Sequence, residues 1–352
     1  MLKGSVKPSA VGYEWFITKS KLARPLPRSP DHSYTLEKNK TYVVRLKEKL
    51  DARLRKSGAI HGQATAKSSV GRVDVLARLI VDGMTTYERF DPIGLENGSG
   101  EMFLEITPIT FDVKIKEGIS LSQLRFFYGD PTKVVINSIP LFNTIFRERE
   151  HLDESLTVNL DDATIGDPKG TTCKGIAFRS KSSSEKPEPV PLWRADNKPN
   201  PCDYWDLEVA DESRLYIKQD NFYILRSKEK LSVPKGVAIY CRASDETMGE
   251  MRIHYAGFVH PYFGLYREDG KKGTPLIFEV RGHQVPVSLA DKEKMANLIF
   301  YRMAEDAPTL TPEQEKEEAK GYGSQDLKLS KFFAEWPNKI KRNGDGTVEA
   351  IR

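Results

Sequence analysis

Apolar residues recur at every second position in several short stretches of the chain, as they do in β-strands that bury one face. The alternation of Phe111, Val113 and Ile115 predicts one such strand. Further strands are predicted over residues 41–46, 102–106, 121–127 and 215–225. Helical periodicity is scarce, and residues 313–320 are the main stretch that favours a helix. Many short strands separated by Gly and Pro turns predict an all-β sandwich or barrel.

Three other stretches predict loops. Residues 1–40 are rich in Pro, Ser and Lys, and residues 91–100 contain one proline and three glycines. Residues 161–200 have few large apolar side chains. Within this last stretch, we expect residues 180–191 to be the most flexible connection.

Length and composition limit the number of domains and the kinds of partner that we expect. The 352 residues are enough for two domains, and 54 basic against 50 acidic residues give a net charge of only +4. This balance gives no indication of a nucleic acid polymer as partner, although a compact anion would need only a local basic patch. No apolar run approaches the length of a membrane span, and the first residues lack the apolar core of a signal peptide.

The cysteines bear on the compartment. Cys173, Cys202 and Cys241 are odd in number and widely spaced, which does not suit a disulfide framework. We expect reduced thiols and therefore a cytoplasmic protein.

An internal repeat relates the two halves of the chain. Residues 42–50 and 223–231 are identical at six of nine positions. Later, Met-Phe-Leu-Glu at residues 102–105 corresponds to Leu-Ile-Phe-Glu at residues 276–279, and apolar residues follow both glutamates at the same spacing. These matches keep their order along the chain, so we predict two copies of one β module.

The repeat suggests a division of the chain into three parts. The first module would occupy residues 1–160 and the second residues 161–305. Residues 306–352 would form a C-terminal helix and tail.

A short basic turn in the first module is the main candidate for anion binding. Lys67, Ser68, Ser69 and Arg72 place two cations and two hydroxyls within six residues, after one strand-like stretch and before another. Such groups at one turn can bind a polyphosphate. The alternative is a Ser/Gly turn whose charges are only solvated.

The same turn in the second module has a different charge. At residues 244–250, Asp245 stands opposite Lys67 and Glu250 opposite Arg72. Coulomb repulsion would make this turn a poor triphosphate site. Only the first module is therefore expected to hold phosphates at this turn.

Glu105 and Glu279 lie at equivalent places within apolar strands of the two modules. A carboxylate in such surroundings is costly unless it is hydrogen-bonded or functional. Either glutamate could instead face solvent, because side chains alternate along a strand. If they are buried, they are candidates for proton transfer.

These residues together resemble a known family. Lys-Ser-Ser-Val-Gly-Arg at residues 67–72 resembles the Arg-Ser-Ser-x-Ala-Arg phosphate motif of the dCTP deaminase and dUTPase superfamily. Residues 254–264, with His254, Ala256 and His260, resemble its nucleoside hairpin, and the two glutamates resemble the strand glutamate that follows that hairpin. Tyr322 and Gln325 lie in a stretch similar to its C-terminal lid.

The chain departs from the family pattern at several positions. Lys67 replaces the first arginine of the motif, which keeps the charge but loses bidentate binding. His260 replaces the aspartate that meets the sugar 3′-hydroxyl in the family. The first module also lacks a clean Asp-Pro-Gly hairpin, since its turn runs over residues 91–100.

The resemblance implies a fold and a reaction. It implies two tandem dUTPase-like β-clip modules, each a distorted jelly roll, followed by a lid tail. The implied reaction is hydrolytic deamination of dCTP to dUTP and ammonia, which supplies dUTP for thymidylate synthesis. Glu279, or Glu105 as second choice, would activate water. The residues that would bind the nucleotide are Lys67, Ser68, Ser69, Arg72, His254, Ala256, His260, Tyr322 and Gln325.

The resemblance also implies partners and cofactors. Mg²⁺ would accompany the triphosphate, and the protein would be a homo-oligomer with sites between modules. Zinc is not expected, because a zinc deaminase needs His-x-Glu and Pro-Cys-x-x-Cys. Pro201-Cys202 is followed by Asp203, Tyr204 and Trp205, without a second cysteine.

Three alternative functions remain open. The chain could be a dUTPase, or a bifunctional enzyme that releases dUMP and pyrophosphate. It could be a degenerate nucleotide-binding protein without catalysis, or a structural β scaffold.

Overall fold

In the computed structural model the chain forms two compact units. Unit 1 contains Met1–Val134 and Pro187–Lys198, and unit 2 contains Val135–Lys186 and Pro199–Arg352. The structure describes residues 1–8, 12–136, 138–148, 153–161, 163–166, 172–181, 187–209, 214–244, 251–254, 257–267, 273–320, 326–336, 340–342 and 348–350. In this part of the chain, no helix is long and apolar enough to cross a membrane.

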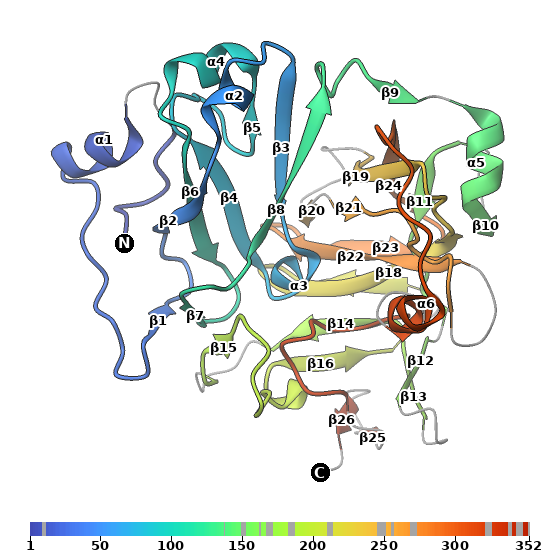
Figure 1. Cartoon of the computed structure of the whole chain (residues 1–352). Coiled ribbons are helices and arrows are strands. Elements are labelled where there is room, and N and C mark those ends of the chain that lie inside the picture. The colour runs from blue at the N-terminus through green and yellow to red at the C-terminus, as the bar shows by residue number, and fades with distance from the viewer. Residues whose placement is uncertain are drawn as a thin grey trace. The chain divides into compact units, whose positions relative to one another are not determined.

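Unit 1 is built mainly from short antiparallel strands (Figure 1). Its strands are β1 (Ser33–Leu36), β2 (Tyr42–Lys49), β3 (Ile60–Ala66), β4 (Val75–Val81), β5 (Arg89–Phe90), β6 (Glu101–Pro108), β7 (Val113–Lys116), β8 (Ser122–Tyr128) and β15 (Val190–Pro191). Its helices are α1 (Tyr13–Lys19), α2 (Ala52–Arg55), α3 (Ser68–Gly71) and α4 (Pro92–Asn97). The strand orders are β2-β6-β4, β5-β3-β8 and β1-β7-β15.

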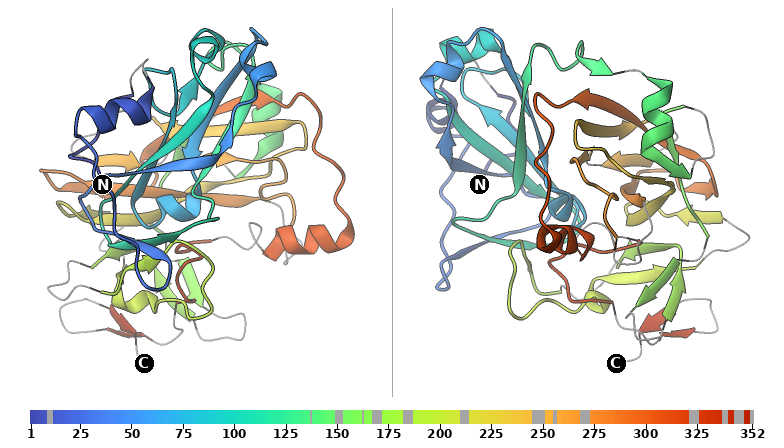
Figure 2. Two further views of the ribbon diagram at one scale, coloured as in Figure 1. Left: turned by 60° about the vertical axis from the view of Figure 1, so that its left-hand side comes forward. Right: turned by 45° about the vertical axis from the view of Figure 1, so that its right-hand side comes forward.

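The N-terminal segment covers one face of the β2-β6-β4 sheet. Leu2, Tyr13 and Ile17 pack with Ile80 of β4 and Phe103 of β6 in one buried cluster. Figure 2 shows α1 outside the strands of this unit. The other face of β4 contributes to a second cluster with β3 and β5. The sheet is therefore buried on both faces, which explains the nearly continuous apolar run in β4.

Unit 2 has two larger sheets. Its strands are β9 (Val135–Ile136), β10 (Phe146–Glu148), β11 (Ser155–Thr157), β12 (Ala163–Gly166), β13 (Thr172–Gly175), β14 (Ala177–Ser180), β16 (Trp205–Glu208), β17 (Arg214–Ile217), β18 (Phe222–Leu231), β19 (Val237–Ala243), β20 (Met251–His254), β21 (Phe258–Val259), β22 (Thr274–Gly282), β23 (Val287–Ala290), β24 (Lys294–Arg302), β25 (Ile340–Arg342) and β26 (Val348–Ala350). Its helices are α5 (Ile139–Ile145), α6 (Pro312–Glu318) and the 3₁₀ turn η1 (Pro201–Asp203).

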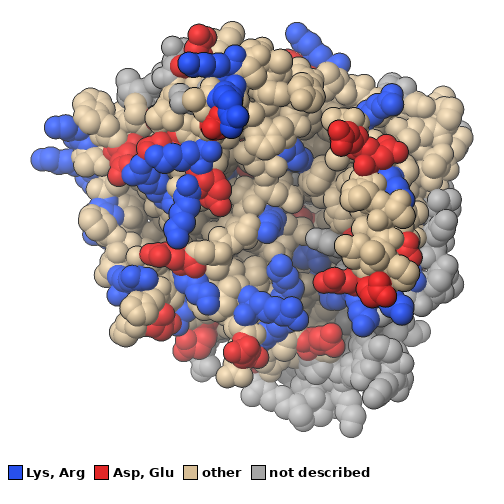
Figure 3. Space-filling view, viewed as in Figure 1, with Lys and Arg blue, Asp and Glu red and all other residues tan. Residues whose placement is uncertain are grey.

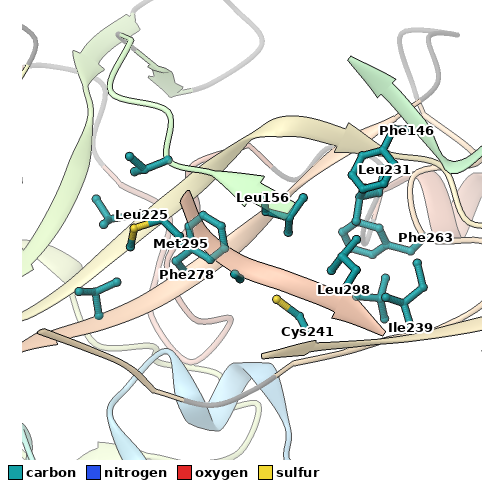
Figure 4. Packing of buried hydrophobic residues seen from close by; sticks show 14 of the residues in the cluster. Phe146, Leu156, Leu225, Leu231, Ile239, Cys241, Phe263, Phe278, Met295 and Leu298 are labelled. Atoms are coloured by element: carbon teal, nitrogen blue, oxygen red, sulfur yellow. The ribbon is translucent and has the colours of Figure 1, made fainter. Parts of the chain in front are cut away.

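The core of unit 2 lies between the sheet β16-β14-β18-β22-β20 and the sheet β11-β24-β19-β21. Leu225 and Phe278 from the first sheet lie beside Met295 and Leu156 from the second (Figure 4). Two sheets with apolar inner faces form a sandwich. The prediction of an all-β chain is therefore confirmed.

Most predicted strands are present, with one clear error. The run over residues 215–225 is two strands, β17 and β18, which belong to different sheets. Asp220 between them adopts a positive φ of 56°, and the amide N–H of Asn221 returns to the carbonyl of Lys218. A tight turn therefore separates the two strands, and the four consecutive polar residues at 218–221 mark its place in the sequence.

The connection over residues 180–191 was also misjudged in part. Residues 182–186 lie outside the described residues, but β15 pairs in parallel with β7. Val190 and Leu192 are buried. This end of the connection is therefore a strand of unit 1.

The observed unit boundary differs from the predicted one at residue 160. β9 and β11 pair with β24, and β10 pairs with β18, so residues 135–160 belong to unit 2 by strand pairing. Residues 306–352 are counted in unit 2 as well. The predicted helix over residues 313–320 is present as α6, which starts with a capping box between Thr311 and Gln314.

Candidate active site

The two units repeat one three-stranded arrangement, and each places a glutamate on its middle strand. The strand orders β2-β6-β4 and β18-β22-β20 correspond. Glu105 in β6 lies opposite Arg78 of β4, and Glu279 in β22 lies opposite His254 of β20. Arg78 and His254 therefore hold equivalent positions beside the two glutamates.

A shared irregularity supports this correspondence. The β2–β6 pairing shifts register between Arg45 and Lys49, and the β18–β22 pairing shifts between Arg226 and Lys230. These four residues belong to the repeated segments at 42–50 and 223–231. The sequence repeat therefore corresponds to a structural repeat, in which the strand order, the pairing register and the position of the register shift all recur.

Glu105 is 1% exposed and held by donors from three segments. The Ser5 hydroxyl donates to Oε1 at 2.9 Å, and the amide N–H of Val6 donates to Oε2 at 3.2 Å. Arg78 donates to Oε1 and forms an ion pair with it, and the Tyr87 hydroxyl lies 3.1 Å from Oε2. The negative charge of the carboxylate is therefore balanced by the arginine, and its oxygens accept hydrogen bonds, which offsets the cost of burying it.

Replacing Arg78 with methionine should destabilise the protein by about 3 kcal/mol, because the buried carboxylate of Glu105 would lose its cation. The guanidinium would also leave the Tyr87 ring, whose centroid lies 4.1 Å away. Urea unfolding measures the change. Arg53→Met is the control, since Arg53 is almost fully exposed and its pair with Asp51 should contribute less than about 1 kcal/mol.

The double variant Arg78→Met/Glu105→Leu separates the ion pair from other effects of the substitution. Removing both charges should recover part of the lost stability, because no unpaired charge remains buried. A double variant less stable than Arg78→Met would contradict this account of Glu105.

Glu279 is also buried, at 5% exposure, but its surroundings differ. It has Ile224 on one neighbouring strand and His254 on the other, so no arginine stands directly opposite. Burial, and to a smaller extent the charge of Glu279, raise the pKa of the Cys241 thiol to about 12. Cys241 therefore stays protonated near neutral pH and is a poor nucleophile.

The basic turn is compact and lies in unit 1. Lys67 ends the β3–β8 ladder, with its amide N–H bonded to the carbonyl of Leu121, and it caps the short helix α3. Ser68 is exposed, Ser69 is half-buried and Arg72 is 9% exposed. The structure thus gathers the four predicted phosphate-binding residues on a single turn. The acidic turn of the second module, residues 245–250, lies outside the described residues.

His260 lies in unit 2 after β21 and contacts α6. Its Nδ1 is 2.5 Å from the carbonyl oxygen of Pro261, and its Nε2 is 3.3 Å from Oε1 of Glu318. Burial raises the pKa of Glu318, Glu317 raises it further, and the charge of His260 opposes this. The predicted hairpin residue thus has a carboxylate partner that the sequence did not indicate.

Charge on the surface is mixed. Figure 3 shows Lys and Arg interspersed with Asp and Glu over the face in view, without a continuous basic surface there. Within the described residues, no group of three or more His, Cys, Asp or Glu side chains is arranged to hold a metal ion.

Comparison with known proteins places both halves of the chain in one family. Residues 29–130 match the model of the 2′-deoxycytidine 5′-triphosphate deaminase (DCD) N-terminal domain, and residues 145–333 match that of the DCD C-terminal domain. The chain belongs to the dCTP deaminase family. It is therefore an enzyme, a hydrolase that deaminates dCTP.

A solved structure supports the same assignment. The crystal structure of 2′-deoxycytidine 5′-triphosphate deaminase from Agrobacterium tumefaciens superposes with a TM-score of 0.71 at 26% identity, covering 87% of this chain and 86% of that one. The fold of the deaminase is thus the dUTPase-like all-β fold. No curated protein matches the chain.

Several predicted residues of the deaminase cannot be placed. Ala256, Tyr322 and Gln325 lie outside the described residues, and only the backbone of His254 is described. The tail just after Gln325 is described from Asp326 onward.

Residues 326–336 are anchored on unit 2. Asp326 forms an ion pair with Arg226 of β18, and Trp336 packs against Phe178 of β14 with ring centroids 4.9 Å apart. Leu327, Leu329 and Phe332 of this tail are all buried.

Arg78 was missed because its partner is distant in sequence. It follows Arg72 by six residues, whereas His254 follows Glu250 by four, so the turn-based alignment did not pair Arg78 with His254. Only the strand register brings the two positions into correspondence. The available signal was a basic residue within the predicted strand that precedes the glutamate. A search for such residues could have selected Arg78.

Proposed function

We propose that the enzyme converts dCTP and water to dUTP and ammonia with Glu279 as its general base. The observation that supports this choice is the difference between the two equivalent glutamates. Glu105 is compensated by Arg78 and by the segment that contains Ser5 and Val6, whereas Glu279 has His254 at the position of that arginine. The oxygens of Glu105 are taken up by its ion pair and hydrogen bonds, so Glu105 suits a structural role.

In the proposed mechanism Glu279 takes a proton from water as the water oxygen attacks C4 of cytosine. The tetrahedral carbon then carries a hydroxyl and an amino group. The same carboxyl group passes one proton to N3 of the ring and helps to transfer another to the amino group. Ammonia leaves and the C4 carbonyl of dUTP forms. One water is consumed and one ammonia released, and the proton balance needs no other group.

Lys67, Ser68, Ser69 and Arg72 would bind the triphosphate. Hydrogen bonds from cations to phosphate oxygens are shorter and stronger than neutral ones. Mg²⁺ would accompany the triphosphate and neutralise part of its charge, while the four residues of the basic turn bind the phosphates. Zinc would not take part, because glutamate supplies the activated water.

The remaining residues of the proposed site surround the nucleoside. His254, Ala256 and His260 would form its hairpin, and Tyr322 and Gln325 would close over the nucleotide. We further propose a cytoplasmic homo-oligomer that supplies dUTP for thymidylate synthesis. The sequence-based prediction that sites lie between modules stays a prediction.

A product assay tests the proposal. Incubation with dCTP and Mg²⁺ should yield equal amounts of ammonia and dUTP, and excess o-phenanthroline, which removes zinc, should leave the rate unchanged. Release of dUMP and pyrophosphate would instead identify a bifunctional enzyme. Loss of activity that zinc alone restores would rule out the glutamate mechanism.

A further inference from the structure

Both ring nitrogens of His260 face oxygen atoms. The carbonyl oxygen of Pro261, 2.5 Å from Nδ1, can only accept a hydrogen bond, so Nδ1 carries a proton. Neutral imidazole then has a lone pair on Nε2, which faces Oε1 of Glu318 at 3.3 Å. Both Nε2 and Oε1 are shielded from solvent. A lone pair and a carboxylate oxygen repel each other unless a proton lies between them.

We propose that His260 and Glu318 share one proton, and that this proton fastens helix α6 to residues 258–266, the described segment that overlaps the predicted nucleoside hairpin of residues 254–264. The pair is then either imidazolium with carboxylate or imidazole with carboxylic acid, and it is neutral in both forms. Glu318 is thus a positioning residue that acts through His260. The inference rests on the proposed function only in placing the nucleoside at this hairpin.

Other contacts show that α6 and the hairpin are joined at several points. The Tyr262 hydroxyl donates to the carbonyl of Pro308, just before α6. Tyr266 hydrogen-bonds with Glu315, one turn before Glu318 on the same face of the helix. These contacts hold α6 close enough for Glu318 to reach His260.

The shared proton makes the contact sensitive to pH. Burial raises the pKa of Glu318, so the folded state holds this proton more tightly than the unfolded chain does. Its contribution to stability is therefore present at low pH and is lost as pH rises through the raised pKa. Once the proton is gone, Nε2 and the carboxylate repel and α6 should separate from the hairpin.

Other titratable groups lie beside this contact. Tyr262 and Tyr266 have pKa values raised above that of a free phenol, mainly by burial, so both stay protonated below pH 10. Lys235 donates a hydrogen bond to Thr309 just before α6. Glu315 and Glu317 are the carboxylates beside Glu318 on α6.

Hydrogen exchange across α6 tests the shared proton without requiring activity. In the wild-type protein, exchange corrected for its intrinsic pH dependence should increase severalfold as the pH is raised in steps from about 5 to about 9, because the shared proton is lost over this rise. Glu318→Gln replaces the shared proton with a fixed N–H donor to Nε2, so its corrected exchange should be independent of pH. Glu317→Gln is the control: it keeps the shared proton, so its exchange should still rise with pH, with the rise moved to lower pH because Glu317 no longer raises the pKa of Glu318.

A kinetic measurement connects the pair to the hairpin. The KM for dCTP should rise with pH in the wild type and in Glu317→Gln, with a smaller change in kcat, and it should stay flat in Glu318→Gln. Glu318→Ala should show fast exchange and high KM at all pH values. Equal pH profiles in the wild type and Glu318→Gln would overturn the proposal. If hydrogen exchange across α6 depends on pH but the protein releases no ammonia, only the proposed function is refuted.

Discussion

Replacing Glu279 with glutamine is expected to lower kcat for ammonia release from dCTP by about a thousandfold, within the range found for loss of a general acid–base group. Glutamine has nearly the same shape, so the buried position on β22 should remain filled. It cannot accept a proton from water or pass one to the ring. Substrate affinity, measured with dUTP as ligand, should change much less than kcat.

Glu105→Gln is the matched control, because Glu105 holds the equivalent position on β6. Its expected effect is on stability, since Arg78 would lose its anionic partner while the hydrogen bond from Val6 can remain. Ammonia release should stay within about threefold of the wild-type rate at temperatures where the variant is folded. Activity lost in Glu105→Gln and kept in Glu279→Gln would reverse the assignment.

Local signals in the sequence were enough to predict the class of fold. The alternation over residues 111–115 marked β7, which buries Val113 and Ile115, and the repeat marked β2 and β18 as equivalent strands. The turn between β17 and β18 was missed although residues 218–221 are four consecutive polar residues, Lys-Gln-Asp-Asn, at which the prediction should have ended the strand. β15 was missed because its pairing with β7 joins segments more than 70 residues apart. Pairings at that separation leave no periodic trace in a single sequence.

The site was predictable where its residues are neighbours in the chain. The basic turn falls on one short helix because its members lie within six residues. Both glutamates are buried, which is one of the two orientations that the alternation along a strand left open. What separates the two glutamates is a contact between strands, namely Arg78 opposite Glu105. The same reason hid Glu318, which reaches His260 from 58 residues further along the chain.

The second large effect is expected at the basic turn. Lys67→Ala should raise the KM for dCTP about tenfold, because one charge-assisted hydrogen bond to phosphate is worth about 1.5 to 3 kcal/mol. Adding Arg72→Gln should raise it about a hundredfold, if the two contacts act independently. Lys67 is partly exposed, so its removal should not disturb folding. The kcat should fall less, since neither side chain takes part in proton transfer.

The ligand series and a control variant identify the phosphates as the cause. Affinity for dUTP should fall in both variants, whereas affinity for deoxyuridine, which lacks phosphate, should not change. Arg53→Ala removes an exposed arginine from another turn of unit 1 and should leave both affinities unaltered. Equal losses for dUTP and deoxyuridine would mean that the substitutions disturb the nucleoside part of the site. An unchanged KM in the double variant would mean that the triphosphate binds elsewhere. The difference in charge between the two turns would then say nothing about which module holds phosphate.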